Sequence, residues 1–348
     1  MQERIEAKWI DAFAEVFTLS AVRPGDEVVI LSESQSRPVN VHLAELALLR
    51  LGARPFHVQL PTPPQRVALP VRSTGASQAI QGNKGVMAAL TGVPVIVDCT
   101  VEGLMHAPEL PAILQSGARV LNISNEHPEA LERLMPTPEM KATVLAAARV
   151  ARQATEMRVT SAAGTDLTVD LSGAPTVGIW GYTDRPGTLA HWPGGIVVSF
   201  PRANSVNGTL VLDRGDINLT FKRYLTDPLV LTLQNDYVVD IQGAGTDYEL
   251  MTRYLAGWDD PLAYAVSHVG WGLNPAARYE ALSMYAYQDT NGTEIRAYAG
   301  NFLFSTGANE FAGRFTEGHF DIPVRGCTIS LDGRDVVVAG LPVLLGDG

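Results

Sequence analysis

The stretch GDEVVILSESQSRPVNVHLAELALLRLGARPFHVQ (residues 25–59) decides the fold of the amino-terminal part of the chain. Glu27–Ser32 is an apolar run of buried-strand length, and Val39–Leu51 carries apolar residues at helical spacing and stops at Gly52. Pro55–Gln59 has the pattern of a second strand. A strand, a helix and a strand in this order predict two parallel strands joined by a crossover helix.

The alternation of strands and helices continues beyond this stretch. Gly92–Asp98 (GVPVIVD) is a third predicted strand, Arg119–Asn122 a fourth, and Pro138–Gln153 a helix. We therefore predict an α/β amino-terminal domain over residues 1–153, with a parallel sheet and helices on both faces. In such a sheet, functional residues tend to gather at the carboxyl ends of the strands.

From Met157 onward the chain has the pattern of short alternating strands separated by turns. MRVTSAAGTDLTVDLSG predicts a hairpin, and one helix over Tyr248–Leu255 interrupts further strands. The prediction is a β-rich α+β carboxyl-terminal domain over residues 154–348 that carries the metal site. The tail after Gly340 (LPVLLGDG) is apolar and then acidic, and has two interpretations: it packs on a neighbouring subunit, or it covers the site.

Composition excludes several classes of function. The net charge of -11 argues against nucleic acid and against an anionic membrane surface as partners, since both favour a basic face. Cys99 and Cys327 lie far apart, which argues against a disulfide framework or a thiolate zinc site. The amino terminus lacks an apolar signal core, and no apolar run reaches the roughly 18 residues of a membrane span. We expect a cytoplasmic protein.

His319 and Asp321 lie two residues apart in GHFDIP. On a strand their side chains leave the same face and can hold one ion together; the alternative is a surface strand that carries two polar residues. Such a pair with one distant histidine is the ligand set of non-heme iron oxygenases, which leave coordination positions open. Zinc hydrolases use comparable ligands, so the pair does not by itself choose a reaction.

Three other histidines are candidates for a site. His268 lies in the apolar, glycine-rich SHVGWGLNP, where it is either a ligand or a satisfied core histidine. His191 precedes WPGG, a turn that enters a strand, and His106 follows the third predicted strand. Loops of this kind present side chains to a site, although ordinary loop polarity accounts for both residues as well.

Four segments together resemble the thermophilic-aminopeptidase family of metallopeptidases: AAGTDLTVDLSG, HWPGGIV, VGWGLNP and GHFD. The resemblance covers essentially the whole chain and implies an α/β amino-terminal domain and a β-rich metal-binding domain. Members of that family hold two metal ions with glutamates, histidines and an aspartate. This chain has Ile196 and Val197 where one glutamate belongs and His268 where another belongs, whereas His319 and Asp321 match the family's histidine-x-aspartate.

Further family ligands fall in a stretch that matches Arg296–Ser305 (RAYAGNFLFS), which contains no histidine. Two divalent ions about 3.5–4 Å apart need carboxylates that offset their charge. With two carboxylates lost and one imidazole gained, the pattern indicates one ion held by His268, His319 and Asp321, with positions open for a substrate and a gas.

This altered pattern, with His106 and His191, resembles the 2,5-dihydroxypyridine 5,6-dioxygenases of bacterial nicotinate degradation. The resemblance implies that mononuclear Fe(II) supports cleavage of 2,5-dihydroxypyridine by O2 to N-formylmaleamate. It also implies that His106 and His191 serve as acid/base and as substrate-binding residues, without deciding which of them is the base. Ser305, beside Thr306-Gly307, is a further candidate for a hydrogen bond to the substrate, or else an ordinary turn serine.

Some alternatives stay open at the level of sequence. Mn(II) shares the ligand preferences of Fe(II). A metallo-aminopeptidase or related hydrolase would hold two ions and act without oxygen, and a non-catalytic binding module would hold none. Relatives of this fold assemble as homo-oligomers, and we expect the same here.

Overall fold

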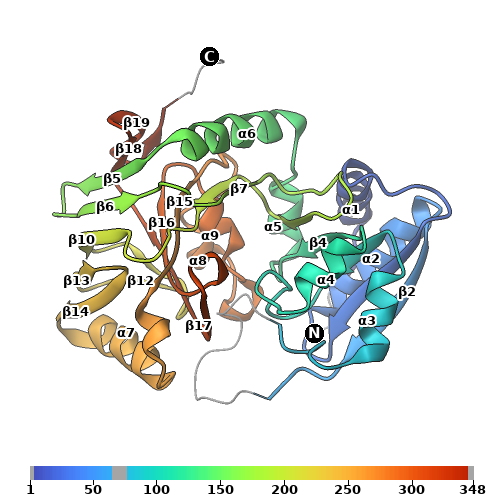
Figure 1. Ribbon diagram of the computed structural model, residues 1–348. Coiled ribbons are helices and arrows are strands. Elements are labelled where there is room, and N and C mark those ends of the chain that lie inside the picture. The colour runs from blue at the N-terminus through green and yellow to red at the C-terminus, as the bar shows by residue number, and fades with distance from the viewer. Residues whose placement is uncertain (1–3, 65–76, 344–348) are drawn as a thin grey trace.

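The structure is a computed structural model that describes residues 4–64 and 77–343. Figure 1 shows two parts side by side, a helix-flanked sheet formed mainly by the amino-terminal residues and a mostly β part formed by the carboxyl-terminal residues. The fold is thus mixed α/β, with one parallel sheet and several antiparallel sheets. Residues 344–348 of the tail after Gly340 lie outside the described range, so its role stays a prediction.

The amino-terminal part is built on a five-stranded parallel sheet with the order β2-β1-β3-β4-β8. All of its neighbouring strands pair in parallel. Four of the five strands were predicted from the sequence at nearly these bounds. The strands are β1 (Glu27–Glu33), β2 (Arg54–Leu60), β3 (Val95–Asp98), β4 (Arg119–Ile123) and β8 (Leu189–Trp192).

Helices cover both faces of the parallel sheet. Successive residues of a strand point to opposite faces, so Val28 and Ile30 pack with α1 and α2, whereas Val29 and Leu31 pack with α3 and α4. This double burial explains why β1 is an uninterrupted apolar run rather than an alternating one. The helices are α1 (Ala7–Leu19), α2 (Pro38–Arg50), α3 (Lys84–Thr91), α4 (Leu110–Gln115) and α5 (Pro128–Arg133).

Strand β8 was not predicted. The sequence analysis placed a turn at WPGG and assigned nothing to Leu189–Ala190. The segment LAHW pairs in parallel with β4, and Trp192 is fully buried among the amino-terminal core residues. The ring of Trp192 packs edge-on against Phe13, 5.0 Å away between ring centres. The chain thus returns from the second part to complete the first sheet. The predicted domain boundary between residues 153 and 154 stays a prediction.

The carboxyl-terminal part contains an eight-stranded antiparallel sheet with the order β14-β13-β10-β6-β5-β18-β19-β20. The hairpin predicted from residue 157 onward is confirmed as the antiparallel pair β5–β6. The strands are β5 (Glu156–Ser161), β6 (Asp166–Asp170), β10 (Val206–Leu212), β13 (Leu229–Gln234), β14 (Tyr237–Gly243), β18 (Cys327–Leu331), β19 (Arg334–Val338) and β20 (Leu341–Pro342).

A second antiparallel sheet, of five strands in the order β17-β16-β15-β9-β7, shares a core with the first. Val159 and Leu167 of the eight-stranded sheet lie in one cluster with Phe302, Phe304 and Phe320 of the five-stranded sheet. The strands of the second sheet are β7 (Thr176–Ile179), β9 (Ile196–Ser199), β15 (Val266–Gly272), β16 (Phe302–Asn309) and β17 (Arg314–Val324), beside a small pair β11 (Ile217–Asn218) and β12 (Arg223–Tyr224).

The helix α6 (Pro138–Gln153) has the predicted bounds and packs on β7 and β9 of the second sheet. Its amino terminus is capped by Thr137, whose hydroxyl accepts a hydrogen bond from the amide of Met140 at 3.1 Å. Gly178 of β7 allows the close approach, because a Cβ there would lie 2.7 Å from Val144 Cγ1. The helix thereby closes one face of the sheet that carries the metal-site residues.

The prediction of a single helix in the second part is wrong. The predicted helix is α7 (Gly245–Gly257), but several shorter helical segments accompany it. They span three to five residues each, too few for an apolar helical period to register in the sequence. They are α8 (Ala281–Met284), α9 (Thr293–Ala297), η1 (Pro261–Tyr264), η2 (Tyr287–Asp289) and η3 (Glu310–Ala312).

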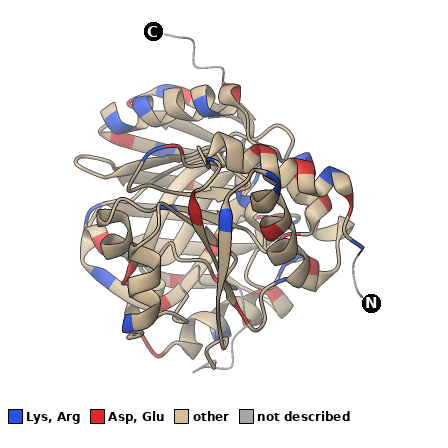
Figure 2. Cartoon of the chain, turned by 90° about the vertical axis from the view of Figure 1, so that its right-hand side faces the viewer, with Lys and Arg blue, Asp and Glu red and all other residues tan. Residues whose placement is uncertain are grey.

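The charged residues lie mainly on helices and loops. Figure 2 shows acidic and basic segments interspersed over the side that it faces. Within the described residues, no helix combines the length and the apolar character needed to cross a bilayer.

Candidate metal centre and active-site cavity

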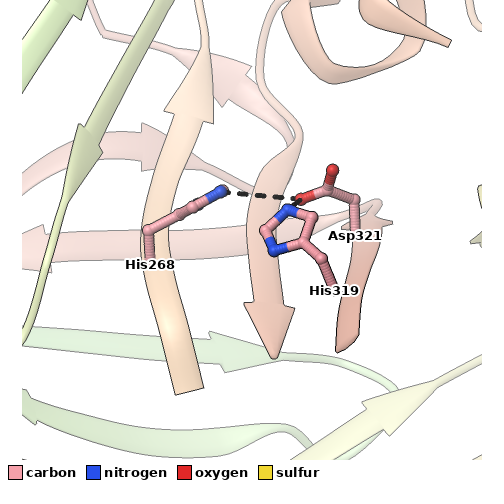
Figure 3. Close-up of side chains that lie close together, drawn as sticks. All are labelled: His268, His319 and Asp321. Carbon is pink, nitrogen blue, oxygen red and sulfur yellow. Dashed lines mark ion pairs between the residues drawn. The ribbon is translucent and has the colours of Figure 1, made fainter. Parts of the chain in front are cut away.

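His319 and Asp321 lie on β17, so the condition for a chelating pair, that this segment is a strand, is met. Both side chains are buried, and their spacing of two places them on one face of the strand (Figure 3). His319 Nε2 lies 3.3 Å from Asp321 Oδ1.

His268 comes from β15, which is separated from β17 by the single strand β16. Its Nε2 lies 3.6 Å from the same oxygen, Asp321 Oδ1. Ser305 of β16 stands directly opposite Asp321 in the sheet. Cross-strand neighbours point to the same face of a sheet. The small side chain of Ser305 therefore leaves room for the longer side chains of His268 and Asp321 to approach each other.

One ligand atom from each of His268, His319 and Asp321 lies within 4.8 Å of the others. The dashed lines in Figure 3 mark the contacts of the two histidines that converge on the carboxylate. Across residues 4–64 and 77–343, this is the one group of three such side chains that is arranged to hold a metal ion.

The donor atoms fit a divalent metal. Asp321 Oδ1 is buried and lacks a hydrogen bond of good geometry to any described residue. A buried polar atom left unsatisfied costs about 1–3 kcal/mol, more when it is charged, and a cation bound among the three side chains would offset this cost. Two imidazoles and one carboxylate on one side of an ion form the facial set that first-row divalent metals accept.

Arg296 controls the second oxygen of the carboxylate, since its Nε donates a hydrogen bond of 2.6 Å to Asp321 Oδ2. Burial by itself would raise the pKa of Asp321, but the guanidinium of Arg296 and then His319 outweigh it and hold that pKa well below its ordinary value. Burial lowers the pKa of His268 to about 3, against the opposing charge of Asp321. A carboxylate and a neutral imidazole are the forms that bind metal.

The sequence analysis did not single out Arg296. It lies on α9, whose start is held by Glu126, a buried residue that follows β4. Glu126 Oε1 accepts hydrogen bonds of 2.8 Å from the amides of Gly292 and Thr293, and Oε2 accepts one of 2.8 Å from Asn291. No local sequence pattern indicates these hydrogen bonds, because they join residues that are far apart in the chain.

A cavity of about 100 Å³ opens onto the three predicted ligands. Its lining combines an apolar wall with a few polar groups, as in sites for small molecules. The apolar lining is Met105, Ile179, Leu189, Ile196, Val198, Phe200 and Leu303, and the polar lining beyond the ligands is Glu102, His106, Asn122, His191, Asn291, Thr293 and Arg296.

His106 lines this cavity from the loop after β3, as predicted, with its ring centre 5.2 Å from that of His319. The loop is organised by the fully buried Asp98. Asp98 Oδ1 accepts hydrogen bonds from the amide and the hydroxyl of Thr100, at 3.0 and 2.6 Å, and Oδ2 accepts one of 2.9 Å from the amide of Leu104. The carboxyl end of the parallel sheet thus delivers His106 to the site.

His191 also lines the cavity, but it lies on β8 and not in the predicted loop. Its Nδ1 lies 2.8 Å from the carbonyl oxygen of Pro193, and since a carbonyl can only accept, Nδ1 carries the proton. Burial lowers the pKa of His191 to about 4, although this hydrogen bond raises it. The ring is therefore neutral near pH 7, and its Nε2 is a hydrogen-bond acceptor.

Ser305 is placed differently from the prediction. It is fully buried and is absent from the described residues that line the cavity. Its hydroxyl accepts a hydrogen bond from the amide of His268 and donates one to the carbonyl of His268, each at 3.2 Å. It therefore supports the strand segment that carries a predicted ligand.

Comparison with known proteins assigns the family. The family model described as 2,5-dihydroxypyridine 5,6-dioxygenase matches residues 8–343. A protein of that name from Pseudomonas putida is 38% identical over 338 residues, which cover 96% of this chain and 95% of the relative. The chain belongs to the 2,5-dihydroxypyridine 5,6-dioxygenase family.

Solved structures agree with this assignment. The structure of 2,5-dihydroxypyridine dioxygenase from Pseudomonas putida matches with a TM-score of 0.93 at 37% identity, over 98% of this chain and 99% of that one. AmpT from Thermus thermophilus matches with a TM-score of 0.64 at 16% identity, over 97% and 99%. The second likeness shows the fold alone, and it confirms the fold that the resemblance to thermophilic aminopeptidases implied.

Proposed function

We propose that this member of the dioxygenase family is an Fe(II)-dependent enzyme that cleaves 2,5-dihydroxypyridine with O2 to N-formylmaleamate in nicotinate degradation. The observation that carries the proposal is the convergence of His268, His319 and Asp321 on one point at the wall of a small cavity. The name of the 38% identical relative supports the substrate and the position of ring opening.

In this proposal His268, His319 and Asp321 hold the metal. Bound Fe(II) would supply the redox chemistry that O2 needs and the Lewis acidity that lowers the pKa of a substrate hydroxyl. Arg296 occupies Asp321 Oδ2 and thus leaves Oδ1 for the metal. With three protein ligands, the metal would keep coordination positions for the substrate and O2.

The two cavity histidines receive different proposed roles. His191 has a pKa of about 4, so it is a weak base near neutrality, and we assign it the orientation of the substrate through its Nε2 acceptor. His106 lies beside His319, a predicted metal ligand. From this position it would reach a substrate hydroxyl bound near the metal, and we assign the proton transfer to His106. The apolar wall around Phe200 would hold the ring and exclude water from it.

The predicted role of Ser305 changes. Both hydrogen bonds of its hydroxyl go to the main chain of His268. We propose that Ser305 positions His268 and does not contact the substrate. Assembly as a homo-oligomer and a cytoplasmic location stay part of the proposal, and gel filtration of the purified protein tests the first.

A metal count with an oxygen-controlled assay tests the proposed function. Protein reconstituted anaerobically with Fe(II) should hold one iron per chain and consume 2,5-dihydroxypyridine only after O2 is admitted. His106→Ala should retain iron and slow turnover by about 10²–10⁴-fold. His191→Ala should retain iron and weaken substrate binding, and the exposed His57→Ala serves as the control. Two ions per chain, or turnover without O2, would refute the proposal in favour of a hydrolase, and absence of bound metal would indicate a binding module.

A further inference from the structure

His106 has a carboxylate neighbour that the proposed mechanism does not use. Glu310 Oε1 lies 3.4 Å from His106 Nδ1. The side chain of His106 is 7% exposed and that of Glu310 is 37% exposed. His106 belongs to the amino-terminal part and Glu310 to the turn η3 between β16 and β17, so this contact joins both parts of the molecule at the cavity.

The turn that carries Glu310 is firmly held. The side chain of the fully buried Asn309 accepts a hydrogen bond of 3.2 Å from the amide of Ala312 and donates one of 2.9 Å to the carbonyl of Pro201. Phe311, which follows Glu310, has its ring centre 5.1 Å from that of Phe200, a cavity-wall residue. A turn fixed in this way presents the Glu310 carboxylate at a defined place.

The chemistry of the contact gives the histidine an orientation. Burial by itself would raise the pKa of Glu310, but the contact with His106 outweighs it and lowers that pKa, so Glu310 is an ionised acceptor. An ionised carboxylate can only accept, and Nδ1 of His106 is therefore the donor. In a neutral ring this leaves Nε2 as the acceptor. The ring of His319 also lies close to that of His106, 5.2 Å away between ring centres.

We propose that Glu310 is a positioning residue that orients the ring of His106 and keeps its Nδ1 as a donor, so that Nε2 is the atom available to the substrate. This inference rests on the proposed acid/base role of His106. Glu310 touches neither the cavity nor the three predicted ligands among the described contacts, so it acts through His106.

A double-mutant cycle tests the inference. Glu310→Ala should lower kcat by about 10–100-fold in the native background and by less than about twofold in the His106→Ala background, because partners that act as one unit are not additive. Glu310→Gln retains an oxygen acceptor and should restore most of that loss. Equal losses in both backgrounds, or a Glu310→Ala variant within twofold of the native kcat, would overturn the proposal. Glu249→Ala, an exposed glutamate of α7, is the matched control.

Two further measurements keep the inference separate from the function itself. Iron content per chain should be unchanged in Glu310→Ala, and loss of iron would place Glu310 in the metal site instead. Crystal structures should show one ordered His106 ring in the native protein and a rotated or multiply oriented ring in Glu310→Ala. An unchanged ring would contradict the inference, whether or not the native protein turns over 2,5-dihydroxypyridine.

Discussion

The two oxygens of Asp321 have separate partners, and this division is the central feature of the site at the scale of single residues. Oδ2 accepts from Arg296, whereas Oδ1 lies 3.3 and 3.6 Å from the two histidine Nε2 atoms. A carboxylate fixed on one side presents a single oxygen in a defined direction. Arg296 thereby holds Asp321 so that Oδ1 faces the two predicted histidine ligands.

The first prediction concerns His268. His268→Ala removes one of three predicted ligands and should abolish both iron retention and O2 consumption. Iron is measured by elemental analysis after desalting, and O2 uptake with an electrode. The exposed His57→Ala is the control. Full activity in His268→Ala would contradict the ligand assignment.

The second prediction concerns Arg296. Arg296→Gln removes the guanidinium that holds Asp321 and should weaken iron binding by about 10–100-fold, as expected for a residue that orients a ligand. Competition with a chelator measures the Kd. Arg253→Gln, on the exposed face of α7, is the matched control. An unchanged Kd in Arg296→Gln would show that Asp321 needs no such support.

The sequence predicted the three ligands but not their supports. His319 and Asp321 could be predicted from the sequence because residues two apart on a strand point to the same face. His268 stood out because it replaces a glutamate of the peptidase pattern. Arg296 and Glu310 lie on segments of five and three residues, and nothing in such short segments indicates which side chain will turn toward the site.

At the scale of elements, the short helix α9 depends on a residue from the other part of the molecule. Glu126 accepts the amides at its start, and Arg133 pairs with Glu294 within it. Since α9 carries Arg296, the amino-terminal part indirectly fixes Asp321. The contacts of Glu126 and Arg133 with α9 therefore connect the folding of the two parts with the geometry of the site.

The third prediction concerns Glu126 and its hydrogen bonds to the start of α9. Glu126→Gln places an amide donor against a backbone donor and should lower the free energy of unfolding by about 1–3 kcal/mol. Urea denaturation measures the effect, and the exposed Glu129→Gln of α5 is the control. Equal stability of the two variants would show that α9 does not need the buried carboxylate.

The fourth prediction concerns pH and Asp216, which precedes β11. Burial raises the pKa of Asp216 to about 6, against hydrogen bonds from the amides of Arg325 and Asp213. The folded state therefore holds this proton more tightly than the unfolded chain, whose Asp has a pKa near 4. Its contribution to stability is complete below about pH 4 and is lost as the pH rises to about 6.

A shift of about two units corresponds to about 3 kcal/mol. The free energy of unfolding of the native protein, relative to Asp216→Asn, should fall by up to this amount between pH 4 and pH 7. Urea denaturation at several pH values gives the two curves, with the exposed Asp240→Asn as control. Parallel curves for the native protein and Asp216→Asn would contradict the assignment.

Elements with a clear period were predictable, and those defined by long-range pairing were not. The apolar run of β1 and the helix α6 have patterns that extend over several residues. The four residues of β8 have none, because their position depends on pairing with residues of β4 that lie 69 positions earlier in the chain. For this reason His191 was assigned to a loop although it lies on a strand.

At the scale of the whole molecule, the cavity combines two kinds of sheet. The antiparallel sheet supplies the three predicted ligands from β15 and β17, and the parallel sheet supplies His106 and His191 from its carboxyl edge. The fold is shared with AmpT, whereas the three side chains that could hold an ion, His268, His319 and Asp321, match the single-ion set predicted from the sequence. The chemistry thus depends on the residues placed in the fold and not on the fold itself.

Isotope labelling tests the central claim most directly. The Fe(II)-loaded protein is given 2,5-dihydroxypyridine under ¹⁸O2 in ordinary water, and the product is analysed at once by mass spectrometry. Ring cleavage by a dioxygenase inserts both atoms of O2, so the product mass should rise by about four units relative to the product formed under ¹⁶O2. A product that carries oxygen only from water would contradict the account and favour hydrolysis at the same site.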